Sequence, residues 1–252
     1  MYGKETRLRR LYRHSDRLLI VPMDHGVSIG AVDGLKNVAA TVHAVFEGKA
    51  DAVIVHKGLT RYLTDLVSPA DGEIIIHLSA SSNLSPEPNR KELVSSGQHA
   101  LRLGATAVSV HVNLGGPHEP AMLRDLGAVA EECDYWGMPL LAMMYVREGD
   151  PGGEFDPAKI AHAARVAEEL GADLVKVNYT GSPETFRQVT SSVRIPVLIA
   201  GGPKMGSTEE LLAMIQGALQ AGAGGVSIGR NVFQAADPTA LTLKIRRMLD
   251  GE

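Results

Sequence analysis

Cysteine and aromatic residues are scarce in this chain of 252 residues. Cys133 is the only cysteine, so no disulfide bond can form within the chain, and a cytoplasmic, reducing location is expected. Aromatic residues make up 4% of the sequence and hydrophobic residues 44%. We therefore expect a core built from aliphatic side chains and methionine. The segment AEECDYWG is typical of a helix end, which favours a structural role for the Cys133 thiol.

A strong charge bias and long apolar runs are also missing. The formal net charge is −4, which does not favour a nucleic-acid or anionic-membrane surface. No apolar run approaches the length of a membrane span, and Asp24 interrupts the run LLIVPM, which is too short for a signal peptide. The basic segment 1–17 is interpreted as a short solvated helix beneath the main domain or at a subunit contact. A nucleic-acid arm is the less favoured alternative.

Short apolar runs recur eight times, separated by helical patterns. They are rich in β-branched and aliphatic residues and almost continuously hydrophobic, which is typical of strands buried on both faces. Their ranges are 18–24, 52–58, 73–79, 107–113, 139–145, 174–180, 196–202 and 225–231.

Helical spacing of apolar residues predicts helices over 34–48, 92–104, 120–137, 156–171 and 208–222. Two of them have start signals, Asp156-Pro157 and Ser207 with Glu210. Most end in a glycine that can close the helix in the left-handed conformation, namely Gly48, Gly104, Gly137, Gly171 and Gly222. Repeated strand–helix units predict a single-domain (β/α)8 TIM barrel with a short N-terminal helical extension. An open doubly wound sheet is the alternative, but no GxGxxG follows the first strand.

Polar residues gather where these strands end, which is where barrels of this kind build their active sites. Lys176 is the most informative, because it lies between Val175 and Val177 in a strand that should be buried. A buried ammonium is costly, so such a position favours the neutral amine, a nucleophile that attacks carbonyl groups. Lys176 is therefore the candidate Schiff-base residue. Lys57 and Lys204 are the competing lysines, and a structural or phosphate-binding role for Lys176 stays open.

Asp24 and Tyr145 are the candidate groups for proton transfer, because a carboxylate beside an iminium accepts a proton and a phenol relays one. Structural roles at the strand ends are the alternatives for both. The sequences GGPK (201–204) and GR (229–230) follow the last two strands, the usual place for phosphate in such barrels. Tight turning alone is the alternative explanation for these glycines.

Four histidines at strand ends suggest a rival hypothesis. Together with Asp24 they would ligate a divalent metal in a metal-dependent lyase. They are His25, His56, His77 and His111. No short paired spacing such as HxxxH occurs among them, so we favour a site that needs no metal and no other cofactor.

Several stretches together resemble the archaeal-type class I fructose-bisphosphate aldolase (DeoC/LacD-like) family. The resemblance covers essentially the whole chain and is carried by VPMDHGVS (21–28), VHKG (55–58), HLSAS (77–81), YWGMPLLAMMY (135–145), KVNYTG (176–181), AGGPK (200–204) and IGRNVFQ (228–234).

This resemblance implies roles for individual residues. Lys176 matches the Schiff-base lysine, Tyr145 the proton donor and Asp24 the proton acceptor. The implied contacts to substrate and phosphate are His25, Gly26, Val27, Ser28, Val146, Arg147, Gly201, Gly202, Lys204, Gly229 and Arg230. The resemblance also implies a homo-oligomer, a decamer in the family.

The implied reaction is an aldol or transaldol step in a route to aromatic acids. A phosphorylated ketose donor forms an imine, and the resulting three-carbon enamine attacks an aldehyde acceptor, either L-aspartate 4-semialdehyde or glyceraldehyde 3-phosphate. Relatives in secondary metabolism imply a further alternative, the condensation of dihydroxyacetone phosphate with aspartate semialdehyde. Met143 replaces the aromatic residue that is usual in the sugar-phosphate aldolases, which favours the semialdehyde. Asn178 replaces a usual serine, and HLSASSN (77–83) replaces a glycine-rich loop, so the donor sugar stays open. A phosphate-binding barrel that is an isomerase or a non-catalytic sensor is the third class of function.

Overall fold

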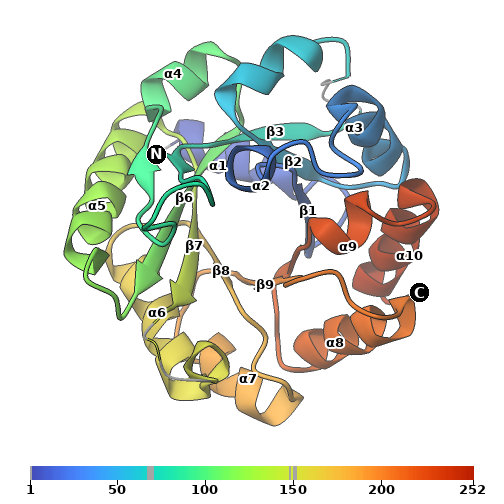
Figure 1. Ribbon diagram of the computed structural model, residues 1–252. Coiled ribbons are helices and arrows are strands. Elements are labelled where there is room, and N and C mark those ends of the chain that lie inside the picture. Colours follow the sequence, from blue (N-terminus) through green and yellow to red (C-terminus); the bar gives the residue numbers. More distant parts are fainter. Residues whose placement is uncertain (1, 67–70, 148, 150–151) are drawn as a thin grey trace.

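A computed structural model describes residues 2–66, 71–147, 149 and 152–252. Eight parallel strands close into a barrel in the order of the chain, and helices surround it (Figure 1). The strands are β1 (Leu18–Pro22), β2 (Ala52–Val55), β3 (Glu73–His77), β6 (Ala107–Leu114), β7 (Leu140–Val146), β8 (Leu174–Val177), β9 (Val197–Ala200) and β10 (Gly225–Ser227). The first and last strands pair, with Leu18 opposite Gly225. The predicted TIM barrel is confirmed, and the open-sheet alternative is wrong.

The helices pack around the outside of this barrel and at its two ends. The longer ones are α1 (Tyr2–Leu11), α3 (Val38–Glu47), α5 (Glu119–Trp136), α6 (Pro157–Glu169), α7 (Pro183–Thr190), α8 (Thr208–Gln220) and α10 (Pro238–Asp250). The shorter ones are α2 (Gly26–Ile29), α4 (Gly97–Arg102), α9 (Arg230–Phe233) and the 3-10 turns η1 (Lys57–Tyr62) and η2 (Gly153–Phe155). No helix in the described part of the chain has the length and hydrophobicity needed to cross a membrane.

Two predicted helix starts are confirmed by side-chain caps. Asp156 accepts the backbone N–H of Lys159 at 3.0 Å, and Ser207 accepts that of Glu210 at 3.2 Å. Such caps satisfy backbone donors that the first helical turn leaves unpaired.

Two expectations about the helices are wrong. The pattern over 92–104 is helical only from Gly97, because Glu92–Leu93 forms β5, which pairs antiparallel with β4 (Ser79–Ala80). Gly48 follows α3 with an ordinary φ of −72°, and Lys49 takes the left-handed conformation with a φ of 67°. Gly48 is needed for close packing instead, since an added Cβ would lie 2.5 Å from the Cβ of Thr242.

Alternate residues along each strand enter two different cores. Leu18 and Ile20 pack inside the barrel, whereas Leu19 and Val21 pack between the strands and the surrounding helices. This period of two is the normal geometry of a strand. It decides which side chains reach the centre of the barrel.

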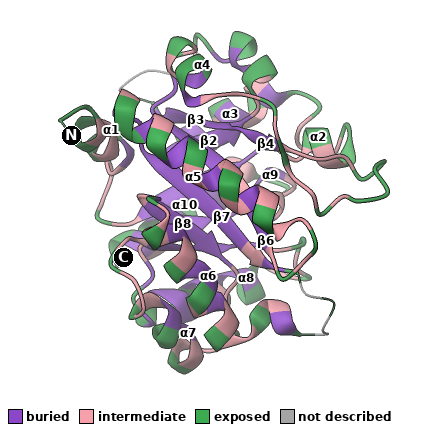
Figure 2. Cartoon of the chain, turned by 90° about the vertical axis from the view of Figure 1, so that its left-hand side faces the viewer, coloured by how far each residue is buried: buried purple, intermediate pink, exposed green. Residues whose placement is uncertain are grey.

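The end of the barrel where the strands begin is closed by α1. Leu11 is fully buried and packs with the inner core, and Figure 2 shows α1 and α2 at opposite ends of the barrel. Arg10 and Arg13 bind the buried carboxylate of Glu73 on β3. The basic segment thus lies beneath the barrel as expected, but it is solvated only in part because two arginines neutralise a buried charge.

Candidate active site

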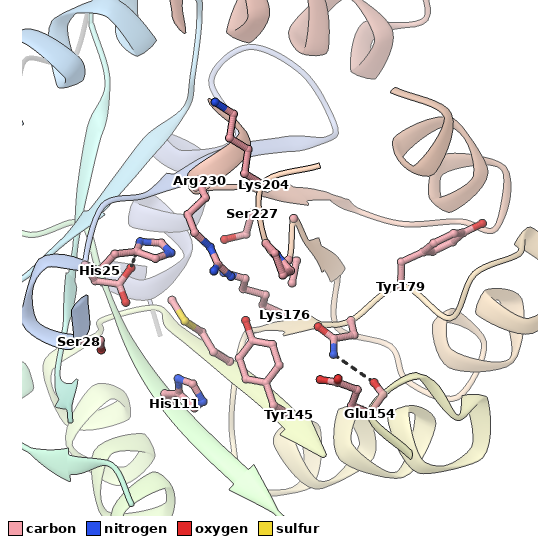
Figure 3. A pocket seen from close by; sticks show the side chains of 18 of the residues that line it. His25, Ser28, His111, Tyr145, Glu154, Lys176, Tyr179, Lys204, Ser227 and Arg230 are labelled. Atoms are coloured by element: carbon pink, nitrogen blue, oxygen red, sulfur yellow. Dashed lines mark hydrogen bonds and ion pairs between the residues drawn. The ribbon is translucent and has the colours of Figure 1, made fainter. Parts of the chain in front are cut away.

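The other end of the barrel contains a cavity of about 630 Å³ that is ringed by the carboxyl ends of the strands. Its lining includes Asp24, His25, Ser28, Lys91, His111, Met143, Tyr145, Arg147, Glu154, Lys176, Asn178, Gly201, Gly202, Lys204, Ser227, Gly229 and Arg230. Most of the residues that the sequence nominates therefore meet in one place. Figure 3 shows their side chains converging on the space around Lys176.

Strand alternation explains why Lys176 is in the cavity. On β8, Leu174 packs in the inner core and Val175 and Val177 pack outside, so Lys176 takes the inner position nearest the carboxyl end. Its neighbour across the ladder is Met143 on β7. Lys176 is 6% exposed, and no described residue forms a hydrogen bond or ion pair with its amine.

The competing lysines are turned away from this space. The amine of Lys57 donates to the carbonyl of Val94, and Lys57 does not line the cavity. Lys204 lines the rim, but its amine donates to the carbonyl of Gln234 at 2.9 Å, and Figure 3 shows it directed away from Lys176. Lys176 is thus the unpaired amine at the centre.

Asp24 follows β1 and lies among the strand-end histidines. Its carboxylate is 3.7 Å from Nδ1 of His25 and 3.8 Å from Nε2 of His77. Burial raises the pKa of Asp24, but His77, His25 and Lys176 together outweigh it, so the pKa is held well below its ordinary range. Asp24 is therefore ionised near neutral pH and can accept a proton.

Tyr145 occupies the last inner position of β7. Its ring centroid lies 4.8 Å from that of His111 and 5.3 Å from the guanidinium carbon of Arg147. Arg147 also forms an ion pair with Glu154. The phenol is therefore fixed between two neighbours, and Figure 3 shows its hydroxyl directed into the cavity. The sequence also offers Glu148 and Asp150 as partners of Arg147 on a solvated loop, and these two lie outside the described residues.

The loops after the last two strands meet beside Lys176. Gly201 and Gly229 leave no room for a side chain, since an added Cβ would lie 2.6 Å from the side chain of Ile228 and from the carbonyl oxygen of Pro22, respectively. Oγ of Ser227 and Nε of Arg230 are buried, and neither has a hydrogen-bond partner in the described part of the chain. Unpaired buried polar atoms beside close-packed glycines are what an anion site requires.

Three residues nominated by the sequence lie apart from the cavity lining. Val146 is on the outer face of β7 and packs in the core between strands and helices, so its side chain is turned away from the site. Gly26 and Val27 lie on α2 and are exposed, whereas Ser28, next on the same helix, does line the cavity.

The four strand-end histidines do not converge as metal ligands. His77 binds Oγ of Ser109 at 2.8 Å, and His111 binds Oδ1 of Asn113 at 2.9 Å. Within the described ranges no group of three or more His, Cys, Asp or Glu side chains is arranged to hold a metal ion. Burial lowers the pKa of His77 to about 4, although Asp24 opposes the shift.

Three lining residues carried a weaker signal in the sequence. Ser227 is a polar residue at an inner position of a buried strand, the same signal that identified Lys176. Asn178 stands out in the sequence only as a departure from the family pattern, and its side chain donates to the carbonyl of Glu154 at 3.1 Å. Lys91 lies in the long segment between β3 and α4, where no local pattern marks it.

Cys133 lies away from the cavity and is buried on α5. Burial raises the pKa of its thiol to about 12, which supports a structural role.

A parallel barrel with an unpaired lysine on its inner wall and a carboxylate and a phenol beside it is the arrangement of a Schiff-base-forming, class I aldolase. Comparison with known proteins agrees, and the chain belongs to the DeoC/LacD family of aldolases, which it matches over residues 18–235.

Two curated relatives and one solved structure illustrate this membership. The chain is 44% identical over 250 residues to the 2-amino-3,7-dideoxy-D-threo-hept-6-ulosonate synthase of Halobacterium salinarum, covering 99% of this chain and 92% of the relative. It is 43% identical over 249 residues to the 2-amino-4,5-dihydroxy-6-oxo-7-(phosphonooxy)heptanoate synthase of Streptomyces griseus, covering 98% and 90%. A structure of the Schiff-base-forming fructose-1,6-bisphosphate aldolase superposes with a TM-score of 0.88 at 28% identity, covering 98% and 99%.

Proposed function

We propose that this aldolase joins a three-carbon enamine, held on Lys176, to the aldehyde of L-aspartate 4-semialdehyde. The observation that carries the proposal is the Lys176 amine, which is buried, unpaired among the described residues and flanked by Asp24 and Tyr145. The two relatives described above support the choice of acceptor, because both are named for seven-carbon 2-amino acids. The sugar-phosphate aldolase is the competing function.

The first half of the reaction breaks a bond. The Lys176 amine adds to the ketone of the donor, and water leaves as the iminium forms. Asp24, ionised beside this cation, stabilises it and accepts the proton of the donor hydroxyl. The bond between the carbon next to the iminium and the carbon bearing that hydroxyl then breaks, its electron pair forms the enamine, and the hydroxyl-bearing carbon is released as an aldehyde.

The second half makes a bond. The enamine carbon attacks the acceptor aldehyde, and the Tyr145 hydroxyl donates a proton to the new alkoxide. Water then adds to the iminium and releases the product and the Lys176 amine. Asp24 gives up the proton that it accepted and Tyr145 regains one through water, so both groups return to their starting states. Atoms balance, because the water lost at imine formation is consumed here.

Dihydroxyacetone phosphate is a second candidate donor. The Streptomyces relative is named for a product with a phosphonooxy group on carbon seven, whereas the Halobacterium relative is named for a 7-deoxy product. Oγ of Ser227 and Nε of Arg230, which have no partner among the described residues, belong to side chains that lie beside Lys176 in Figure 3, and this favours a phosphate close to the iminium carbon. Dihydroxyacetone phosphate as donor would place it there.

Borohydride trapping tests the proposal. Reduction with a phosphorylated ketose or with dihydroxyacetone phosphate should add mass to the peptide that contains Lys176, and Lys176→Met should abolish the adduct. An adduct on Lys57, Lys91 or Lys204 contradicts the proposed nucleophile. In a competition, aspartate semialdehyde should be consumed before glyceraldehyde 3-phosphate, and the mass of the product shows whether phosphate is retained.

A further inference from the structure

Lys91 places a second cation at the cavity mouth. It immediately precedes β5, which pairs with β4, so it is carried by a hairpin inserted between β3 and α4. Its side chain lines the same cavity as Asp24 and Lys176. Strand periodicity predicts no role for Lys91, and the proposed bond-forming steps do not involve it.

The hairpin is tied to the barrel on two sides. Oγ of Ser28 on α2 donates to the carbonyl of Ser81 at 2.9 Å, and the backbone N–H of Asn83 returns to the carbonyl of Ser28 at 3.0 Å. On the other side, Asn113 of β6 donates from Nδ2 to the carbonyl of Asn89 at 2.7 Å. Lys91 is therefore held in place by contacts to two strand ends.

The charge of Lys91 is not neutralised by the described residues. Its ammonium donates to the hydroxyl of Ser81 and, at 3.0 Å, to the carbonyl of Pro88, and no described carboxylate lies within ion-pair distance. An ammonium has three donors, so these neutral acceptors leave one for a ligand. Arg147, another cation in the cavity lining, already pairs with Glu154 and covers the ring of Tyr145.

The hairpin that carries Lys91 lies on the Tyr145 side of the site, because Asn113, which binds Asn89 of the hairpin, pairs with Tyr145 across the β6–β7 ladder. Lys91 lines the cavity together with Asp24 and Arg147; burial lowers its pKa, Asp24 opposes this shift, and Arg147 adds to it. Arg230 is instead a neighbour of His25, beside the glycine loops. Beside the glycine loops, Arg230 and Lys204 have no described carboxylate partner, and Lys91 is a further such cation on the side of Tyr145.

We propose that Lys91 binds the anionic group of the aldehyde substrate and so selects charged aldehydes. This rests on the proposed function, in which the enamine on Lys176 occupies the side near Ser227 and the aldehyde approaches past Asp24 and Tyr145. The tail of that aldehyde then points toward the hairpin. Its anion is a carboxylate in aspartate semialdehyde and a phosphate in glyceraldehyde 3-phosphate, and both bind an ammonium.

The test compares three aldehydes at a fixed donor concentration: aspartate semialdehyde, glyceraldehyde 3-phosphate and uncharged glyceraldehyde. Lys91→Met should lower kcat/KM for the charged aldehyde that the site recognises by about ten- to hundredfold, the usual range for one charge-assisted hydrogen bond. The value for glyceraldehyde should stay within about twofold. A loss confined to the semialdehyde identifies a carboxylate site, and a loss confined to glyceraldehyde 3-phosphate identifies a phosphate site. Lys91→Arg keeps the charge and should keep the preference.

Lys57→Met is the matched control, because Lys57 also donates to a carbonyl near this hairpin but does not line the cavity. It should leave all three rates unchanged. An equal fall for all three aldehydes in Lys91→Met, an unchanged preference, or the same effect in Lys57→Met would overturn the proposal. Borohydride trapping at Lys176 is measured in parallel, so failure of the lysine chemistry is distinguished from failure of anion selection. If Lys91→Met does not fold, Lys91→Gln replaces it.

Discussion

The side-chain amide of Asn231 on α9 donates to the backbone carbonyl of Gly201 after β9, with an Nδ2–O distance of 2.9 Å. The same amide donates to the carbonyl of Pro203 at 3.0 Å, and its oxygen accepts the N–H of Met205 at 2.7 Å. One buried side chain thus joins the two loops that the sequence assigns to phosphate. The spacing between these loops depends on it.

Asn231→Leu should therefore loosen the phosphate loops. Removing hydrogen bonds from buried groups costs about 1–3 kcal/mol of stability for each group left unpaired. We expect a lower midpoint of urea unfolding and a donor KM raised at least severalfold, with imine trapping at Lys176 retained at saturating donor. Asn231→Asp keeps the acceptor for Met205 and should have a smaller effect on unfolding. A normal donor KM in Asn231→Leu would contradict the link between the two loops.

Arg230→Ala should raise the KM of a phosphorylated donor about ten- to hundredfold, as expected for loss of a charge-assisted hydrogen bond. Ser227→Ala should act in the same direction but more weakly, because a neutral hydroxyl contributes less. Steady-state kinetics with phosphorylated and unphosphorylated ketoses measure both effects. If the wild-type enzyme uses the two ketoses equally well, these loops do not bind phosphate.

Tyr145→Phe should reduce kcat by about a hundred- to ten-thousandfold, the usual contribution of a positioned acid or base. The variant should still form the trapped imine, since the amine of Lys176 is untouched. Asp24→Asn should reduce kcat similarly and should also slow imine formation, because the carboxylate beside the cation is lost. Near-normal kcat in both variants would assign proton transfer to His25 or to water.

Activity should survive exhaustive treatment with a chelator, because an iminium replaces a metal ion as the electron sink. The measurement is turnover before and after dialysis against the chelator, followed by addition of zinc or magnesium. A loss that either metal restores would favour the histidine hypothesis and would count against Lys176.

Stability should fall as the pH is lowered from about 6.5 toward 4, and His77 should account for part of the fall. Its pKa is about 4 in the folded protein and near 6.5 when unfolded, so the unfolded chain binds this proton first. Each pH unit in that window then costs about 1.4 kcal/mol for one such group. Below about pH 4, Asp24 acts in the same direction because its folded pKa is also depressed.

Urea unfolding between pH 4 and pH 7 measures this dependence. His77→Asn keeps a polar partner for Ser109 and should flatten the slope of stability against pH in the window between 4 and 6.5. The exposed His162 on α6 provides the control, and His162→Asn should leave the slope unchanged. An identical slope in wild type and His77→Asn would show that other groups account for the acid sensitivity.

The fold could be predicted because its determinants are local. Eight buried apolar runs, each followed by a helical pattern, identify parallel strands, and capping residues such as Asp156 and Ser207 locate helix starts. The same pattern identified Lys176 as a candidate functional residue. A charged side chain in a buried strand lowers stability, so its presence there indicates a function. The helix expected from residue 92 was wrong because pairing of β5 with β4 prevailed over helical periodicity.

The sequence by itself determined the barrel and, through the period-two alternation of its strands, which side chains face the centre. Only the tertiary structure decided which lysine side chains point into the cavity. Lys57 and Lys204 donate to backbone carbonyls at the ends of other elements, while Lys91 reaches the site on a hairpin held by Ser28 and Asn113. Such contacts join residues far apart along the chain. They form only when the barrel closes, and the local periodicity of the sequence therefore cannot predict them.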